Sequence, residues 1–98
     1  MNIEEYNGTF NFEPGEEILL IYSAPWCSKC EILKRVVGQM DYAGPTRVMS
    51  IDVDKYDEVC REKNILSLPQ ISMVRESGET FLSAGKVLNE RQIREYLK

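Results

Sequence analysis

Two cysteines that stand three positions apart carry the most specific chemistry in this chain. Cys27 and Cys30 form a Cys-x-x-Cys pair shortly after an apolar run and a proline. If Cys27 begins a helix, the unpaired backbone N–H groups of the first turn and the positive end of the helix dipole stabilise its thiolate and lower its pKa. The spacing then predicts thiol–disulfide exchange, in which Cys27 attacks the disulfide of a partner and Cys30 resolves the mixed disulfide.

The flanking residues predict a strand that ends before the pair and a helix that starts at it. Residues 18–22 are a run of large apolar side chains typical of a buried strand, and Pro25 closes that strand because it has no N–H to donate. Cys30 is expected to be buried, one helical turn after Cys27. The helix is also expected to bury a face of apolar residues at helical spacing, namely Ile32, Leu33, Val36, Val37 and Met40.

Two other uses of a Cys-x-x-Cys pair compete with exchange. A structural zinc site usually takes four Cys or His ligands, whereas this chain has no His and only one further cysteine, Cys60. A purely stabilising disulfide would close so short a loop that it would remove little chain entropy from the unfolded state. Redox exchange is therefore the favoured interpretation, and it needs no metal or organic cofactor, because the dithiol is itself the redox centre.

From residue 18 to the final helix, the chain resembles the thioredoxin family. The motifs that carry the resemblance are Ala24-Pro25-Trp26-Cys27 with Cys30, Ile51-Asp52-Val53-Asp54 at a strand end, Leu68-Pro69 before a strand, and Ala84-Gly85 after a hairpin. The first motif is also similar to the domains of protein disulfide isomerases. The resemblance implies a single domain over residues 1–98 with the α/β thioredoxin fold, in which helices flank a central mixed sheet of four to five strands.

The resemblance also implies roles for residues outside the pair. The family's proline at the position of Pro69 is cis and lies against the active-site disulfide, whereas the residues alone identify Pro69 only as a proline at the start of a strand. Leu68 is implied to offer main-chain hydrogen bonds to an extended segment of the substrate. The other residues that the resemblance places beside the pair or around the docking surface are Trp26, Ser28, Lys29, Ala84 and Gly85.

The two residues between the cysteines depart from the family pattern. Ser28 and Lys29 replace the usual Gly-Pro, and this intervening pair tunes the redox poise within the family. A cation in the first turn of a helix is disfavoured by the helix dipole. Either Lys29 stabilises the Cys27 thiolate by proximity, or it is a solvated side chain that points away or contacts acidic partners.

A second departure concerns how Cys30 loses its proton. Thioredoxins carry a buried Asp six residues before the first cysteine and commonly a Lys that pairs with it, but Ile21 and Ser50 stand at these two positions. The joint loss is physically coherent, because a buried Lys without its partner would be costly. The deprotonation of Cys30 must then rely on water, on Lys29 or on a group supplied by the partner.

The third thiol, Cys60, is expected in a short helix. Asp54 is the expected N-cap of this helix, and Asn64 is expected to close it in the left-handed conformation. Tyr56, Val59 and Cys60 fall on one face of it. Cys60 is therefore expected as a small core residue, since free cysteines are among the most buried residue types. A regulatory or dimer-forming thiol is the alternative.

The remaining elements follow from alternation, turn residues and capping patterns. Residues 47–53 alternate into a central strand, and residues 70–74 and 80–84 form a hairpin closed by residues 76–79. The last helix starts with a capping-box pattern, and the residues that define its start and its buried stripe are Asn89, Gln92, Ile93, Tyr96 and Leu97.

The N-terminal segment carries weaker signals. A short first strand is expected around residues 9–11, beside the strand that contains Val48. Thioredoxins have a helix between their first two strands, but residues 13–16 leave room for hardly one helical turn. We therefore expect a trimmed variant of the fold that lacks most of this N-terminal helix.

Composition bounds the remaining possibilities. The chain has 98 residues, a net charge of −4 and 43% hydrophobic residues, which is ordinary for one small domain, and its longest apolar run is too short to span a bilayer. The first 26 residues hold five Glu and no Lys or Arg, which argues against a secretory signal and against nucleic acid as a partner. We therefore expect a cytoplasmic monomer, and a Cys-x-x-Cys pair in that compartment is usually catalytic.

These observations predict a small thiol–disulfide oxidoreductase that reduces protein disulfides. The family resemblance implies disulfide-containing protein substrates and a thioredoxin reductase-type electron donor. Two alternatives remain. An oxidase or isomerase would use the same site if Ser28 and Lys29 make the disulfide unusually oxidising, and a non-catalytic thioredoxin-like module would bind a protein and use the disulfide only structurally.

Overall fold

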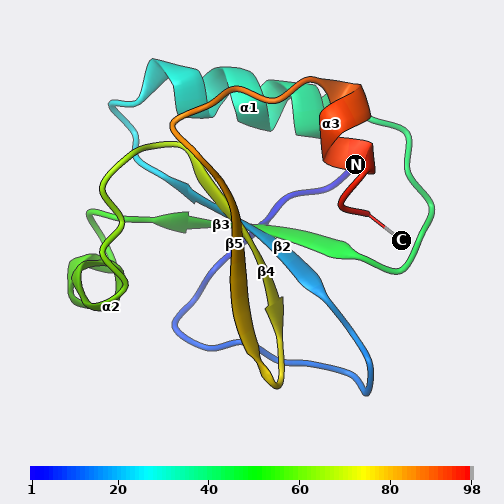
Figure 1. Cartoon of the computed structure of the whole chain (residues 1–98), viewed down its shortest axis with the longest axis horizontal. Coiled ribbons are helices and arrows are strands. Elements are labelled where there is room, and N and C mark those ends of the chain that lie inside the picture. Colours follow the sequence, from blue (N-terminus) through cyan, green and yellow to red (C-terminus); the bar gives the residue numbers. More distant parts are fainter. Residues whose placement is uncertain (98) are drawn as a thin grey trace.

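A five-stranded mixed sheet forms the centre of the molecule, with α1 and α3 over one face and α2 over the other (Figure 1). The computed structural model describes residues 1–97. The predicted fold class is confirmed. In chain order the elements are β1 (Glu4–Glu5), β2 (Ile18–Ser23), α1 (Ser28–Gln39), β3 (Arg47–Asp52), α2 (Asp57–Glu62), β4 (Gln70–Arg75), β5 (Gly78–Ala84) and α3 (Glu90–Arg94).

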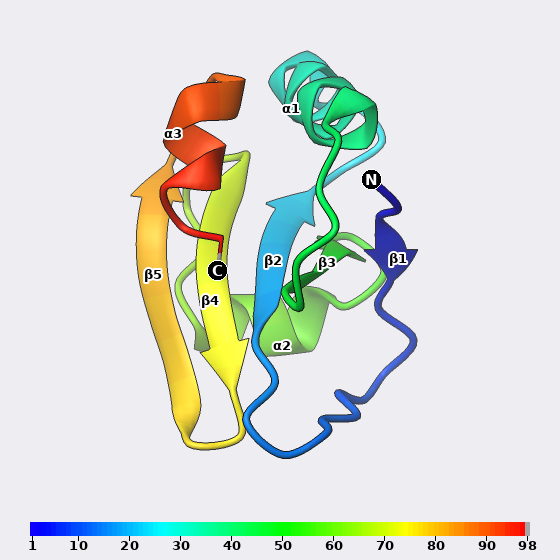
Figure 2. The same ribbon diagram turned by 90° about the vertical axis from the view of Figure 1, so that its right-hand side faces the viewer.

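The strands lie in the order β1-β3-β2-β4-β5, which can be followed across Figure 2. β1, β3 and β2 run parallel, whereas β4 is antiparallel to both β2 and β5. All six residues of β2 are buried. This is expected of a central strand with helices on both faces, and it makes β2 a rigid support for the residues that follow it.

Successive side chains of β2 reach two different cores. Ile21 packs in a cluster with Leu33 of α1 and Ile93 of α3. The next residue, Tyr22, packs on the opposite face of the sheet in a cluster with Cys60 of α2. β2 therefore contributes side chains to the hydrophobic cores on both faces of the sheet, just before the cysteine pair in the chain.

α1 buries a narrower face than the sequence predicted. Cys30, Leu33 and Val37 are buried along it, and Val36 is partly buried. Ile32, however, is 47% exposed, so the prediction that it belongs to the buried face is wrong. At 3.6 residues per turn, a residue two positions after Cys30 is turned by about 200° around the helix axis and faces solvent.

The first strand lies earlier in the chain than predicted. β1 pairs with β3, and the N–H of Tyr6 then donates to the carbonyl of Ser50 at 2.9 Å. The prediction of a strand at residues 9–11 is wrong. Gly8, with a φ of +114°, bends the chain after Tyr6, and the ring of Phe10 then packs on the ring of Tyr6 with their centroids 4.8 Å apart.

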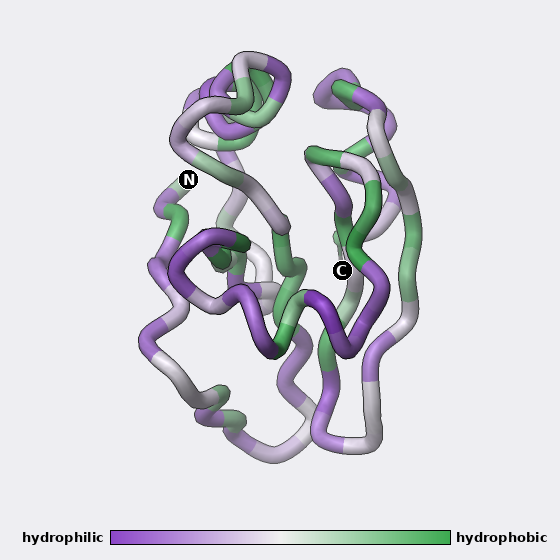
Figure 3. Tube along the Cα trace, turned by 90° about the vertical axis from the view of Figure 1, so that its left-hand side faces the viewer, coloured by the Kyte–Doolittle hydropathy of each residue, from purple (hydrophilic) through white to green (hydrophobic). Residues whose placement is uncertain are grey.

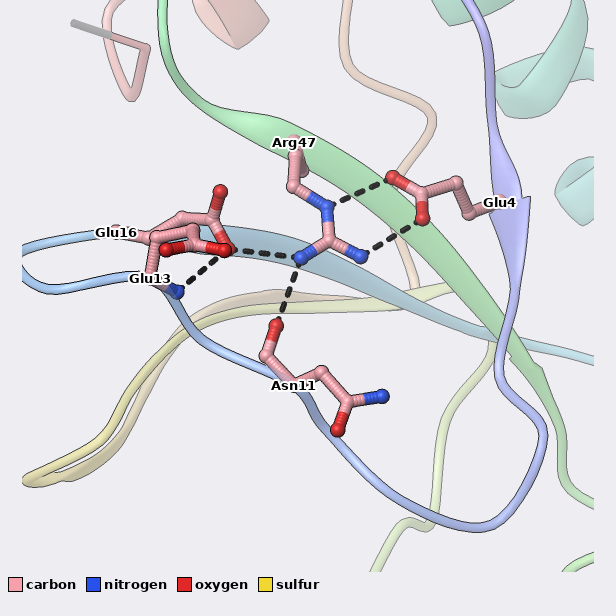
Figure 4. Close-up of polar contacts among 5 residues, drawn as sticks. All are labelled: Glu4, Asn11, Glu13, Glu16 and Arg47. Atoms are coloured by element: carbon pink, nitrogen blue, oxygen red, sulfur yellow. Dashed lines mark hydrogen bonds and ion pairs between the residues drawn. The ribbon is translucent and has the colours of Figure 1, made fainter.

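Arg47 holds the segment that stands in place of an N-terminal helix (Figure 4). Its guanidinium donates to both carboxylate oxygens of Glu4 at 2.7 and 2.9 Å, to the carboxylate of Glu16 at 2.8 Å and to the carbonyl of Asn11 at 2.8 Å. The hydrogen bond and charge of Arg47 hold the pKa of Glu4 below its ordinary value. Within residues 1–97, no helix connects β1 to β2, as the sequence predicted.

α2 begins later in the chain than predicted. Its N-cap is Tyr56, which makes no side-chain cap hydrogen bond, so the prediction that Asp54 caps this helix is wrong. Asp52 organises the preceding turn instead, because its carboxylate accepts the N–H groups of Asp54 and Lys55 at 2.9 and 3.2 Å. The prediction that Asn64 ends the helix in the left-handed conformation is confirmed by its φ of +56°.

The C-terminal elements follow the sequence closely. The hairpin of β4 and β5 forms as predicted. The capping box of α3 is present, since Gln92 N–H donates to Asn89 Oδ1 and Asn89 N–H donates to Gln92 Oε1, both at 2.9 Å. Ile93 is fully buried beneath it. Among the described residues, none of the helices has the length and apolar character that crossing a membrane requires.

Candidate active site

The cysteine pair lies at the first turn of α1, just beyond the end of β2 (Figure 1). Cys27 and Cys30 are joined in a disulfide, with their Cα atoms 5.3 Å apart. Cys27 is the N-cap of α1, and the backbone N–H of Cys30 donates to the Cys27 sulfur at 3.2 Å. In the dithiol form the same donor and the helix dipole would stabilise a Cys27 thiolate.

The two cysteines differ in their access to a partner. Cys27 is 9% exposed, whereas Cys30 is 1% exposed. Ser28 and Lys29, between them, are both exposed. Of the two cysteines, Cys27 is therefore the more exposed to solvent.

The segment before β4 packs against the disulfide. Leu68 contacts the cluster that contains both cysteines, and the Leu68–Pro69 peptide bond is cis, as the family resemblance implied. The carbonyl of Pro69 accepts the N–H of Gly85 at 2.8 Å. Gly85 has a φ of +72°, a left-handed backbone conformation that favours glycine, and a Cβ built on it would be in ordinary van der Waals contact with the Cβ of Ser67 at 3.4 Å.

Trp26 stands beside the pair with 69% of its surface exposed. Its indole N–H donates to the carboxylate of Asp54 at 2.8 Å, which joins the segment before α1 to the turn before α2. This contact replaces the helix cap that the sequence pattern predicts for Asp54. The available signal was that both residues belong to motifs on which the family resemblance rests.

Three of the exposed large apolar side chains lie on loops that connect helices and strands. Leu66 is 88% exposed and Val87 is 37% exposed, in addition to Trp26. Figure 3 shows hydrophobic colour along the connection between α2 and β4. Ala84, at the end of β5, is also exposed. The sequence signal for Leu66, which the predicted site residues did not include, is a leucine in a loop without helical or strand periodicity.

The positions of the family's buried Asp and Lys hold no ionisable side chain. Ile21 and Ser50 are paired across β2 and β3, and both are fully buried. Ile21 packs with Leu33, and the hydroxyl of Ser50 donates to the carboxylate of Glu5 at 3.2 Å. Neither an aliphatic chain nor a neutral hydroxyl acts as a base for the Cys30 thiol.

Cys60 lies outside the site. It is a buried free thiol in the cluster on the α2 face of the sheet, whereas the disulfide belongs to a separate cluster. Burial raises the pKa of the Cys60 thiol, which keeps it protonated and unreactive. The prediction that it is a core residue is confirmed. Within residues 1–97, no group of three or more His, Cys, Asp or Glu side chains is arranged to hold a metal ion.

The known proteins that this chain resembles are thioredoxins. The family model described as Thioredoxin matches residues 2–98. The thioredoxin of Bacillus subtilis strain 168 is 25% identical over 80 residues, which cover 79% of this chain and 77% of that protein. The chloroplastic thioredoxin M3 of Oryza sativa subsp. japonica is 26% identical over 70 residues, which cover 69% of this chain and 40% of that protein. The chain thus spans less than half the length of this second relative.

Solved structures share the fold. The germline-specific thioredoxin Deadhead of Drosophila melanogaster matches with a TM-score of 0.66 at 23% identity, over 82% of this chain and 76% of that chain. Chloroplastic thioredoxin z matches with a TM-score of 0.68 at 23% identity, over 97% of this chain and 90% of that chain. Both likenesses are likenesses of fold.

Proposed function

The chain belongs to the thioredoxin family, whose members with this cysteine pair are thiol–disulfide oxidoreductases, and we propose that it works as a reductase of protein disulfides. Exchange between a dithiol and a disulfide is the chemistry of this domain. The observation that carries the proposal is the disulfide at the start of α1, with a backbone N–H donating to the sulfur of Cys27.

Cys27 is the proposed nucleophile and Cys30 the resolving thiol. The Cys27 thiolate attacks one sulfur of a substrate disulfide in line, and the other substrate sulfur leaves as a thiolate that takes up a proton. Cys30, once deprotonated, then attacks the Cys27 sulfur of the mixed disulfide. This releases the second substrate thiol and forms the Cys27–Cys30 disulfide, so that two electrons pass from the dithiol to the substrate.

The proposed substrate is an extended segment of a protein that lies across the Leu68–Pro69 segment. Leu68 offers its main chain to the substrate, and Pro69 lies behind it. Trp26, Ala84 and Gly85 border the contact. This assignment is supported by the packing of Leu68 on the disulfide cluster and by the exposure of Trp26 beside it.

The proposed partners are disulfide-containing proteins and a reductase-type dithiol donor that regenerates the site. We propose a monomer that works in the cytoplasm, a compartment in which a Cys-x-x-Cys pair is usually catalytic. The dithiol supplies both electrons, so we assign no metal or organic cofactor to the reaction. Lys29, exposed beside Cys27, and Ser28 are proposed to tune the redox poise.

The proposal is tested by reduction of a model protein disulfide with dithiothreitol as electron donor, together with the equilibrium constant of the pair against glutathione. A reductase should turn over the protein disulfide faster than dithiothreitol alone and should show a strongly reducing equilibrium. An oxidising equilibrium with slow reduction would favour an oxidase or isomerase. Alkylation of both thiols without any turnover would favour a protein-binding module.

A further inference from the structure

One carboxylate, that of Glu79 on β5, collects hydrogen bonds from three other elements. It accepts the hydroxyl of Tyr22 at 2.6 Å and the hydroxyl of Ser72 at 2.5 Å, both at Oε2. Its Oε1 accepts the ammonium of Lys63 at 2.7 Å. Lys63 also donates to the oxygen of Tyr22 at 3.3 Å, so the phenol both donates and accepts. We call these four residues the Glu79 network.

The network is enclosed. Tyr22 and Ser72 are each 0% exposed, and the side chains of Glu79 and Lys63 are 12% and 31% exposed. Burial by itself favours a neutral carboxyl, but the hydrogen bonds from Lys63, Ser72 and Tyr22 together hold the pKa of Glu79 below its ordinary value. Glu79 is therefore a charged acceptor at neutral pH. Hydrogen bonds to a charged group in an enclosed site are strong and fix the geometry of their donors.

Each donor stands on an element that leads into the active site. Tyr22 belongs to β2, which ends before Cys27, and Ser72 belongs to β4, which begins directly after Pro69. Lys63 is the C-cap of α2, and the chain runs from it to Leu68. Figure 2 shows β2 and β4 side by side in the sheet, with α2 over one of its faces. Glu79 thus joins β2, β4 and the C-terminal end of α2, the three elements that lie next in the chain to the residues of the site.

Leu68 links the network to the disulfide. It packs against the cluster that contains Tyr22 and against the cluster that contains Cys27 and Cys30. A shift of α2 or β4 relative to β2 would therefore move Leu68 relative to the disulfide. At the other end of β5, Gly85 donates to the carbonyl of Pro69, so the strand that carries Glu79 also holds this segment directly.

We propose that Glu79 is a positioning residue for substrate docking, which sets where the Leu68–Pro69 segment lies relative to Cys27. The inference rests on the proposed function, since the segment matters because a substrate strand lies on it. A buried ion pair adds little net stability in many proteins, and fixing one geometry is a role that such a pair serves. The Glu79 network acts through Leu68 and touches no reacting sulfur.

The test compares Glu79→Gln with Glu76→Gln, an exposed Glu in the same hairpin. With a protein disulfide as substrate, Glu79→Gln should raise KM by roughly five-fold or more, the low end of coupling between sites, with kcat changed much less. The alkylation rate of reduced Cys27 by iodoacetamide should stay the same, because the sulfur and its backbone donor are untouched. Glu76→Gln should leave all three unchanged.

A structural readout keeps the inference separate from the proposed function. Amide hydrogen exchange at Gly85, whose N–H is bonded to Pro69, should be faster in Glu79→Gln than in the wild type. If the wild type reduces no protein disulfide, the proposed function fails, and the exchange rate at Gly85 still tests the positioning role. An unchanged exchange rate and an unchanged KM in a folded Glu79→Gln protein would refute it.

Lys63→Met gives a second route if Glu79→Gln does not fold. It removes one donor and leaves Tyr22 and Ser72 on the carboxylate. On its own it should raise KM in the same direction and accelerate amide exchange at Gly85, and no change in either would overturn the proposal. Where Glu79→Gln folds, the Lys63→Met/Glu79→Gln double variant should be no worse than Glu79→Gln alone, since both changes break one network. Fully additive effects on KM would show that the two residues act independently and would overturn the proposal.

Discussion

The indole N–H of Trp26 and the carboxylate of Asp54 meet at 2.8 Å, across 28 positions of sequence. The bond joins the segment that presents Cys27 to the turn that follows β3. Trp26 is otherwise largely exposed, so this one contact fixes a large ring on the surface where a partner is proposed to dock. A fixed ring loses little conformational entropy when the partner binds.

Replacing Asp54 should release this ring. In Asp54→Ala we expect a lower fluorescence anisotropy of Trp26, which is the only tryptophan of the chain. The free energy of unfolding should fall by only about 0.5–1.5 kcal/mol, as for one hydrogen bond. Asp57→Ala is the matched control, because Asp57 pairs with Arg61 at the surface and does not contact Trp26. Equal anisotropy in both variants would mean that another contact holds the ring.

The two cysteines should respond to substitution in opposite ways. Cys30→Ser should accumulate a mixed disulfide between Cys27 and a protein substrate, because nothing resolves it, whereas Cys27→Ser should form none. Non-reducing electrophoresis followed by mass spectrometry measures both. Cys60→Ala is the control and should behave as the wild type, since Cys60 is buried in another cluster. Accumulation in Cys27→Ser would reverse the assigned roles.

Local sequence signals correctly predicted the strand and the helix that flank the cysteine pair. A buried run, a proline and helical spacing all lie within residues 18–40, and the structure places β2 and α1 there. The capping box of α3 also depends on residues three positions apart and was confirmed. Ile32 was misplaced because an apolar residue was counted toward a face that its rotation about the helix axis excludes.

The features that the sequence did not reveal depend on distant residues. Tyr22 and Glu79 are 57 positions apart, and no spacing rule connects them. The two-residue strand β1 is too short to show a period, and its pairing with β3 is followed by a backbone bond between Tyr6 and Ser50. Asp54 has the residue type and position typical of a helix N-cap, but its carboxylate accepts the indole N–H of Trp26 instead.

Arg47 should anchor the N-terminal segment. In Arg47→Met we expect the free energy of unfolding to fall by about 1 kcal/mol or more, because four hydrogen bonds are lost at a partly buried guanidinium. Amide exchange at Tyr6 should accelerate. Arg61→Met is the control; it breaks one exposed pair within α2 and should cost roughly 0.3–0.5 kcal/mol. Similar losses in both variants would show that the segment is held mainly by its aromatic residues.

Glu79 should make the stability of the fold depend on pH in the acidic range. Its pKa is lowered in the folded state, so its contribution is present above the ordinary glutamate pKa of about 4.3 and is lost as the pH falls through the lowered value. The melting temperature of the wild type should therefore fall more steeply than that of Glu79→Gln between about pH 5 and pH 3. Calorimetry at fixed ionic strength measures both curves. Parallel curves would mean that Glu79 has the same pKa in the folded and unfolded states.

Ile21 should tolerate the family's aspartate only when a lysine accompanies it. Ile21→Asp places a carboxyl in an apolar cluster, and we expect the free energy of unfolding to fall by at least about 3 kcal/mol at neutral pH. In the double variant Ile21→Asp/Ser50→Lys the loss should be smaller, because the two positions are paired across β2 and β3 and the charges can neutralise each other. Urea unfolding measures both.

The same double variant tests how Cys30 loses its proton. If a nearby carboxylate serves as base, resolution of a preformed mixed disulfide should be faster below neutral pH than in the wild type, which has no ionisable group at these two positions. Ile21→Asn/Ser50→Lys has nearly the same shape without the carboxylate and is the control. Equal resolution rates in the wild type and in both variants would mean that water, Lys29 or a group of the partner takes the proton from Cys30, whatever stands at position 21.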